Sequence, residues 1–267
     1  TSGLVLLAVA GSVEILTGAL CAAMAVLSWL ALGLSAPLAG GAPSLRTTLP
    51  VMLLYGILAL AFVVLGIGSL RARRWACALM RAVSRVWLLS GLCTVVVGVL
   101  VLPAMVRETS AGMGVPSGFA AAATLVALAG LAITQVALPA ALWIVHCSPE
   151  VTAICRARDP LPSLLDDCPQ PLLGLAVLCG LAGVSVVVMP AYNFVCPFFG
   201  RLLVGRAGVL PWLAVLVACL ALAWGSCRRR PWAWWGAIAA TLTAAVATVL
   251  TALAVDPLAP QNLYAGT

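Results

Sequence analysis

Seven long apolar runs alternate with short polar segments along this chain of 267 residues. The runs cover residues 3–34, 51–70, 83–106, 118–145, 172–189, 209–225 and 232–255. Each run is close to or above the length of about 18 apolar residues that a membrane-spanning helix needs. The pattern therefore predicts an all-α integral membrane protein with seven transmembrane helices.

The polar segments between the runs are mostly short loops. Residues 36–50 are rich in Pro, Gly and Ser and are expected to form a loop. The longest polar segment, 146–171, has room for a short helix but not for a domain. Between 190 and 208, the aromatic and leucine side chains are expected to lie flat in the membrane interface as a short amphipathic piece.

The composition agrees with a membrane protein. Hydrophobic residues make up 64% of the chain and charged residues 8%, whereas a soluble domain carries roughly 25% charged residues. The net charge of +7 comes from 14 arginines and no lysine, a bias that is typical of a GC-rich genome and suggests a bacterium. Little chain remains outside the membrane to form a basic surface, so nucleic acid is not an expected partner.

The arginines are distributed unevenly between the two sides of the predicted membrane. One side receives ten: Arg71, Arg73, Arg74, Arg81, Arg85, Arg156, Arg158, Arg228, Arg229 and Arg230. The other receives four: Arg46, Arg107, Arg201 and Arg206. The positive-inside rule then predicts a bacterial cytoplasmic (inner) membrane protein with a cytoplasmic N-terminus and an external C-terminus.

A nine-residue sequence occurs twice. Residues 68–76 read GSLRARRWA and residues 225–233 read GSCRRRPWA, with six identical positions at an offset of 157. The copies predict two parallel three-helix repeats, 1–116 and 172–267, joined by the fourth helix and a cytoplasmic loop in 117–171. Convergence is the alternative, because Arg and Trp are favoured at any cytoplasmic helix end.

Two groups of arginines are candidates for contact with anionic lipid headgroups or with a partner. Arg74, Arg81 and Arg85 are spaced by seven and four residues. This spacing places them on one stripe of a helix that begins early, near Trp75. Arg228, Arg229 and Arg230 form the second group. The alternative is a solvated basic flank.

Glu14 is the one acidic residue inside an apolar run, near the predicted middle of the bilayer. A carboxylate at that depth is costly and often functional. Gln135 and Thr134 reach a similar depth from the other side, so we expect Glu14 to face one of them. The pair would either fix helix packing or serve proton-coupled transport. Pro139 is expected to kink the same helix as Gln135.

The remaining chemistry gives no assigned cofactor. His146, Cys147, Cys155 and Cys168 are weak zinc candidates, because their spacing matches no compact zinc motif. Haem or chlorophyll ligation by His146 is an equally weak alternative. The lack of Lys excludes a retinal Schiff base, and a single His excludes bis-histidine haem. With most of the ten cysteines in apolar runs or on the predicted cytoplasmic side, no structural disulfide is expected.

The sequence favours a non-catalytic accessory or scaffold subunit of a larger membrane complex, for example a respiratory or photosynthetic one. Membrane lipids and other membrane subunits are the expected partners. A transporter or carrier that uses Glu14 at the repeat interface is one alternative. A membrane enzyme acting on lipid at the cytoplasmic face is another, although the sequence contains no G-x-S-x-G, H-E-x-x-H or P-loop motif.

Overall fold

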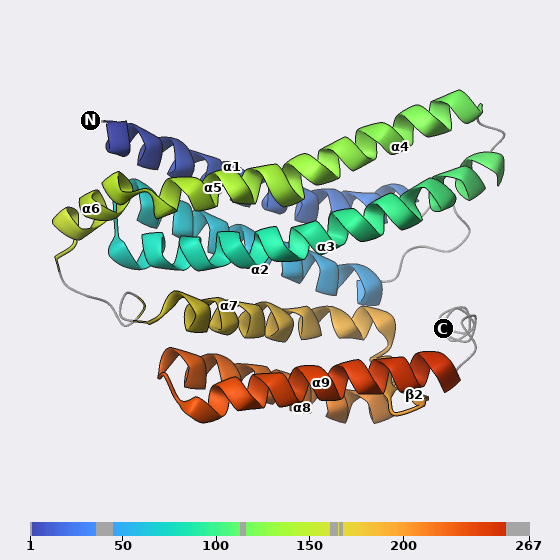
Figure 1. The fold of residues 1–267 in the computed structure, drawn as a ribbon. Helices are drawn as coiled ribbons and strands as arrows, with labels where there is room; N and C mark the ends of the chain where they lie inside the picture. Colours follow the sequence, from blue (N-terminus) through green and yellow to red (C-terminus); the bar gives the residue numbers. More distant parts are fainter. Residues whose placement is uncertain (1, 36–44, 113–115, 161–164, 166–167, 255–267) are drawn as a thin grey trace. The chain divides into compact units, whose positions relative to one another are not determined.

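The computed structural model describes residues 2–35, 45–112, 116–160, 165 and 168–254. In chain order, the elements are α1 (Ser2–Ser35), α2 (Leu45–Leu70), α3 (Arg74–Gly112), α4 (Ser117–Ala132), the π-helical turn η1 (Ile133–Ala137), α5 (Leu138–Cys147), α6 (Pro149–Arg158), α7 (Gln170–Ser185), the 3-10 helix η2 (Val186–Tyr192), β1 (Cys196–Phe198), β2 (Arg201–Leu203), α8 (Arg206–Cys227) and α9 (Pro231–Ala254). Figure 1 shows them in sequence colours.

Seven of the described helical segments are long and apolar enough to cross a membrane, which confirms the predicted all-α, seven-span architecture. One span, Gly118–Cys147, runs without a break through α4, η1 and α5. The early start predicted for the third helix is also confirmed, because α3 begins at Arg74. The loop predicted over 36–50 is shorter than expected, since α2 begins at Leu45 and carries Pro50 inside it.

The described residues group into two compact units. Unit 1 takes those of 1–10 and 68–166, and unit 2 takes those of 11–67 and 167–267. The repeated sequence predicts a different division, into 1–116, 117–171 and 172–267. That division describes a duplication of sequence and not groups of contacting residues, and it stays a prediction.

In unit 1, α3 packs along the span formed by α4, η1 and α5, and α6 contacts both α3 and α5. The π-helical turn ends at Ala137, two residues before Pro139. Proline has no backbone N–H to donate to the carbonyl four residues earlier, here that of Gln135. The preceding residue, Leu138, donates its N–H to the carbonyl of Ile133, five residues earlier, whereas an α-helix uses the carbonyl four residues earlier. The disturbance expected at Pro139 thus takes the form of a local widening of the helix.

In unit 2, α8 packs against both α7 and α9, and a small antiparallel hairpin of β1 and β2 lies between α7 and α8 in the chain. The segment predicted to lie as a short amphipathic piece in the membrane interface thus forms a hairpin, and its place in the interface stays a prediction. Phe199 and Gly200 both have positive φ, 42° and 87°, which forms the two-residue turn that matches the twist of a hairpin. The backbone N–H of Gly200 donates to Thr251 Oγ1 of α9 at 3.1 Å and fixes the hairpin tip.

Candidate functional site

The turn between α2 and α3 organises the arginine end of unit 1, which we define as residues 68–85 and 146–160. The N–H of Ala72 donates to the carbonyl of Ser69 and that of Arg73 to the carbonyl of Gly68, both at 2.9 Å. Ala72 has a φ of 52°. These features form a helix C-cap with a left-handed residue, which ends α2 and allows α3 to start at once. Gly68 is required here, because a Cβ would lie 2.6 Å from Cβ of Ala76.

The second copy of the sequence forms the same turn between α8 and α9. Arg229 has a φ of 55°. Its N–H donates to Ser226 O at 3.0 Å, and that of Arg230 donates to Gly225 O at 2.9 Å. Gly225 again faces the tryptophan and alanine of the next helix. The two sequences are therefore equivalent as local structures, whereas duplication of whole three-helix units stays a prediction.

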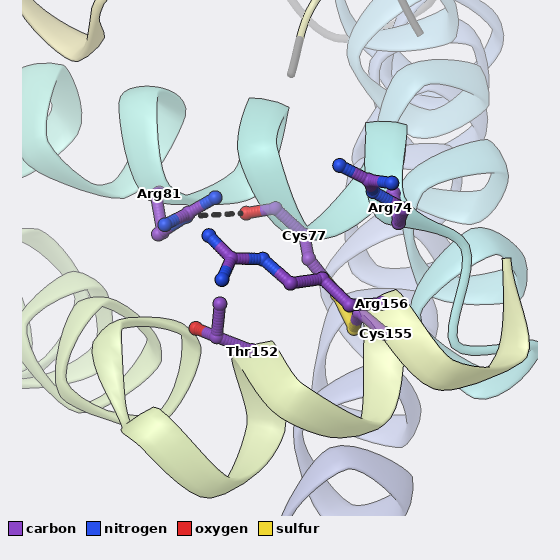
Figure 2. Close-up of a pocket in the computed structure, with 6 residues that line it drawn as sticks. All are labelled: Arg74, Cys77, Arg81, Thr152, Cys155 and Arg156. Carbon is purple, nitrogen blue, oxygen red and sulfur yellow. Dashed lines mark hydrogen bonds between the residues drawn. A yellow bond between two sulfur atoms is a disulfide. The ribbon is translucent and has the colours of Figure 1, made fainter. Parts of the chain in front are cut away.

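A small polar pocket lies at the arginine end between α3 and α6, and we call it the arginine pocket. Its lining residues are Arg74, Cys77 and Arg81 of α3 and Thr152, Cys155 and Arg156 of α6. Its volume is about 50 Å³. Figure 2 shows the side chains of the two helices converging on this space. Arg81 Nε donates to the carbonyl of Cys77 at 3.3 Å, which orients its guanidinium along α3.

A disulfide between Cys77 and Cys155 joins the two walls of the arginine pocket. The expectation of no structural disulfide is therefore wrong for this pair. That expectation rested on the compartment predicted from loop charges, whereas the fold brings the two thiols, 78 residues apart, into one buried cluster with Leu7, Ala72 and Val151. Cys155 in the bonded state offers no thiolate to a metal.

The predicted stripe of Arg74, Arg81 and Arg85 divides in the structure. Arg74 and Arg81 line the pocket, whereas the guanidinium of Arg85 lies over the ring of Trp143 of α5, 5.7 Å from its centroid. In unit 2, Arg228 lies over Trp224 in the same way, also at 5.7 Å. Arg229 and Arg230 are exposed.

Sequence reasoning missed Arg156 and Thr152. A signal was present in Ser148–Pro149, a typical helix start with Ser at the N-cap and Pro at the first helical position. Ser148 Oγ accepts the backbone N–H of Val151 at 3.3 Å. A helix from Pro149 puts Thr152 and Arg156 on one face, four residues apart. The sequence does not predict which helix this face packs against.

Positive charge dominates the arginine end. Its arginines are Arg71, Arg73, Arg74, Arg81, Arg85, Arg156 and Arg158, and its acids are Glu150 and Asp159. Seven charges against two leave an excess of five. Asp159 Oδ1 pairs with Arg73 at 3.7 Å, and its Oδ2 accepts the backbone N–H of Arg74 at 3.4 Å. Glu150 Oε2 accepts a hydrogen bond from Ser2 Oγ at 2.9 Å.

His146 is fully buried and has a structural position. Its Nδ1 lies 2.8 Å from the carbonyl of Leu142. A carbonyl only accepts, so Nδ1 carries a proton, and in the neutral ring Nε2 is then the acceptor toward Ser69 Oγ at 3.4 Å. His146 thereby connects the end of α5 to the last turn of α2.

The other weak metal candidates differ in their surroundings. Cys147 is exposed. Cys168 is buried in unit 2, where its thiol donates to the carbonyl of Ser226 at 3.9 Å. Burial raises the pKa of the Cys168 thiol, and neighbouring Cys227 adds to this effect. Among the residues that the structure describes, no three His, Cys, Asp or Glu side chains are grouped as metal ligands would be.

Glu14 is fully buried on α1, on the face that also carries Gly11 and Gly18. This face packs closely on α2: a Cβ at Gly18 would lie 2.9 Å from the carbonyl of Ala59, and one at Gly66 would lie 2.8 Å from that of Gly11. Glu14 thus belongs to a tight helix pair in unit 2.

Gln135 and Thr134, the two expected partners of Glu14, have contacts within unit 1. Gln135 Oε1 accepts a hydrogen bond from Trp87 Nε1 at 2.9 Å. The hydroxyl of Thr134 donates to the carbonyl of Gly130 in its own helix at 2.8 Å. The pairing with Glu14 joins residues of different units, and it stays a prediction.

Comparison with models of protein families, with curated proteins and with solved structures gives no match for this chain. The fold and the side chains above therefore carry the functional argument alone. They define an integral membrane protein of seven apolar helices with a strongly basic pocket at one end.

Proposed function

We propose that this chain is a non-catalytic accessory or scaffold subunit that holds other components of a larger membrane complex. In this proposal it resides in a bacterial cytoplasmic membrane with its N-terminus in the cytoplasm. Other membrane subunits contact its apolar helices, and anionic lipids contact its arginine-rich turns.

The observation that carries the proposal is a set of glycines inside the spans with no packing contact. A Cβ added at Gly56 of α2, Gly130 of α4 or Gly180 of α7 would meet no atom within 4 Å. Glycine in a helix interior costs about 1 kcal/mol relative to alanine. In membranes, small residues on a helix face allow another helix to approach closely. These positions therefore suit contact with helices of other subunits.

The α4 face around Gly130 extends this pattern. Ala123 and Ala127 lie on the same face, seven and three residues earlier, and all three residues are exposed. In the most apolar 18-residue stretch of each of the seven spans, between 6% and 28% of the residues are buried. Most residues of these apolar stretches are thus not buried within the described chain, which suits contact with lipid or with a neighbouring subunit.

The polar side chains of the spans support a packing role over a polar pathway. Several hydroxyls donate to carbonyls of their own helix, four residues earlier: Thr17, Thr94, Thr124, Thr241 and Thr248, at 2.8–2.9 Å. Hydroxyls bound in this way add little polarity to the helix surface.

Purification from native membranes in polymer nanodiscs tests the proposal. We expect stoichiometric partner subunits with the wild-type chain and their loss with Gly130→Leu, because the larger side chain blocks close helix approach. Ala121→Leu places the same side chain on the same helix, two and a half turns away on the opposite side, and should retain the partners. A wild-type chain that purifies alone and monodisperse would overturn the proposal.

A proton-coupled carrier is the second candidate, and the burial of Glu14 in the middle of a span favours it. Proteoliposomes with an internal pH dye test this candidate. It predicts proton flux that is lost in Glu14→Gln and kept in Glu150→Gln, whose carboxylate lies outside the spans. Wild-type flux no greater than that of empty liposomes rejects it.

A further inference from the structure

We propose that the arginine pocket is a binding site for a phosphate group, with Arg81 and Arg156 as its principal ligands and Arg74 at its edge. This inference does not depend on the assembly role proposed above, because neither Gly130 nor Glu14 lines the pocket.

The first argument is the convergence of like charges. Arg81 and Arg156 come from different helices, and Figure 2 shows their guanidinium groups turned toward the same space. Among the described residues, neither forms an ion pair with an acid. The two acids at this end are engaged elsewhere, Asp159 with Arg73 and Glu150 with Ser2. An anion between the guanidinium groups replaces their mutual repulsion by attraction.

The size of the pocket indicates what kind of anion fits. Its volume is about 50 Å³, and a single water requires about 10–15 Å³ of such space. The pocket therefore holds about four oxygen-sized groups, as a tetrahedral oxyanion has. Guanidinium groups bind phosphate through paired, charge-assisted hydrogen bonds, which favours this ligand.

The position of the pocket adds a third argument. Arg74 is the first residue of α3, so the edge of the pocket at Arg74 lies at the positive end of that helix dipole, whereas Arg156 lies in the last turn of α6. Trp75 and Trp143 mark the level of the membrane interface, where lipid phosphates lie. The phosphate group therefore has two possible sources, a lipid headgroup or a free phosphate.

The Cys77–Cys155 disulfide connects the two halves of the site. It bonds the α3 segment that carries Arg74 and Arg81 to the α6 segment that carries Thr152 and Arg156. The two helix segments that carry these guanidinium groups are thus held together despite the repulsion between the charges.

Titration of the full chain in nanodiscs tests the site in two arms. One arm titrates inorganic phosphate against nanodiscs of neutral lipid and follows the melting temperature. The other arm uses nanodiscs that contain phosphatidic acid. Native mass spectrometry then compares how much of this lipid stays bound to the wild type and to each variant. Arg81→Gln and Arg156→Gln should each weaken binding at least tenfold. Arg158→Gln removes an equal charge from α6 outside the pocket and should change it less than twofold.

Arg156→Lys keeps the positive charge but loses the paired hydrogen bonds of a guanidinium group. An affinity between those of the wild type and Arg156→Gln supports a phosphate site over general attraction by the positive charges. Ligand-free melting temperatures identify variants that fail to fold. Binding in the first arm identifies free phosphate as the source, and binding in the second arm alone identifies a lipid. Equal losses in the pocket variants and in Arg158→Gln, or binding in neither arm, would overturn the proposal.

Discussion

Gly91 determines how closely α3 can approach the π-helical turn of the neighbouring span. A Cβ at this position would overlap with the carbonyl oxygen of Gln135. That carbonyl is the one that Pro139 leaves without its α-helical donor. A short backbone contact of this kind places the Cα–H of glycine against an oxygen, a weak but favourable interaction at helix interfaces. Two residues far apart in sequence thus depend on each other.

Gly91→Ala is therefore expected to destabilise the protein. The added methyl group must displace the backbone at Gln135, and overpacking of this kind costs about 1–3 kcal/mol. Gly130→Ala is the matched control, because a Cβ there meets open space, so its stability should be unchanged or higher by up to about 1 kcal/mol. Thermal unfolding in detergent, followed by circular dichroism, compares the two. Equal melting temperatures would contradict the contact.

The two repeated turns show what a short sequence specifies by itself. Six shared residues produce the same caps and the same left-handed residue in both copies. Neither copy has glycine at that left-handed position, where a side chain costs about 1–2 kcal/mol. The surroundings differ: Ala72 is fully buried and Arg229 is exposed.

We expect Arg229→Gly to stabilise the protein by about 0.5–1 kcal/mol, since relief of the strained φ exceeds the entropy cost of glycine. Ala72→Gly should be close to neutral, because the same relief is offset by about 0.8 kcal/mol for the lost buried methyl. Arg230→Gly is a control outside the left-handed region. Unfolding midpoints measure all three, and a destabilised Arg229→Gly would show that its conformation is not strained.

The sequence predicted the spans because lipid imposes one rule on every residue, and a run of about 18 apolar residues satisfies it wherever it occurs. The start of α3 at Arg74 followed from the spacing of its arginines. The hairpin at 196–203 did not follow, because its two strands are only three residues long each. The partners of Arg156 did not follow, because they depend on which surfaces meet. The disulfide was missed for the same reason, since Cys77 and Cys155 meet only after α6 packs on α3.

The Cys77–Cys155 bond is expected to stabilise unit 1. Loss of a native disulfide typically costs about 2–4 kcal/mol, and the closed loop here is long. Cys77→Ser with Cys155→Ser should therefore lower the melting temperature, whereas Cys93→Ser, an exposed free cysteine, should not. Mass spectrometry of unreduced peptides must also show the 77–155 linkage in the wild type. Its absence under oxidising conditions would contradict the packing of α6 on α3.

For the molecule as a whole, two physical signals at the arginine end point to opposite compartments. The excess of arginines favours the cytoplasm. A disulfide favours an oxidising compartment, because cytosolic thiols are kept reduced. Both signals come from the same place in the structure, since the arginine pocket is lined by arginines and by the bonded Cys77 and Cys155. Orientation therefore decides whether this bond is permanent or forms only under oxidation.

We expect the charge bias to determine the orientation, because it acts on every loop during insertion whereas the disulfide forms after folding. Cys147 is an exposed thiol at the arginine end, and a membrane-impermeant maleimide should label it in inside-out vesicles and not in right-side-out vesicles. Gly112→Cys, exposed beyond the opposite end of the third span, should give the reverse result. Peptide mapping assigns each label. Labelling of Cys147 from outside would reverse the topology, and the Cys77–Cys155 bond would then be a permanent structural link.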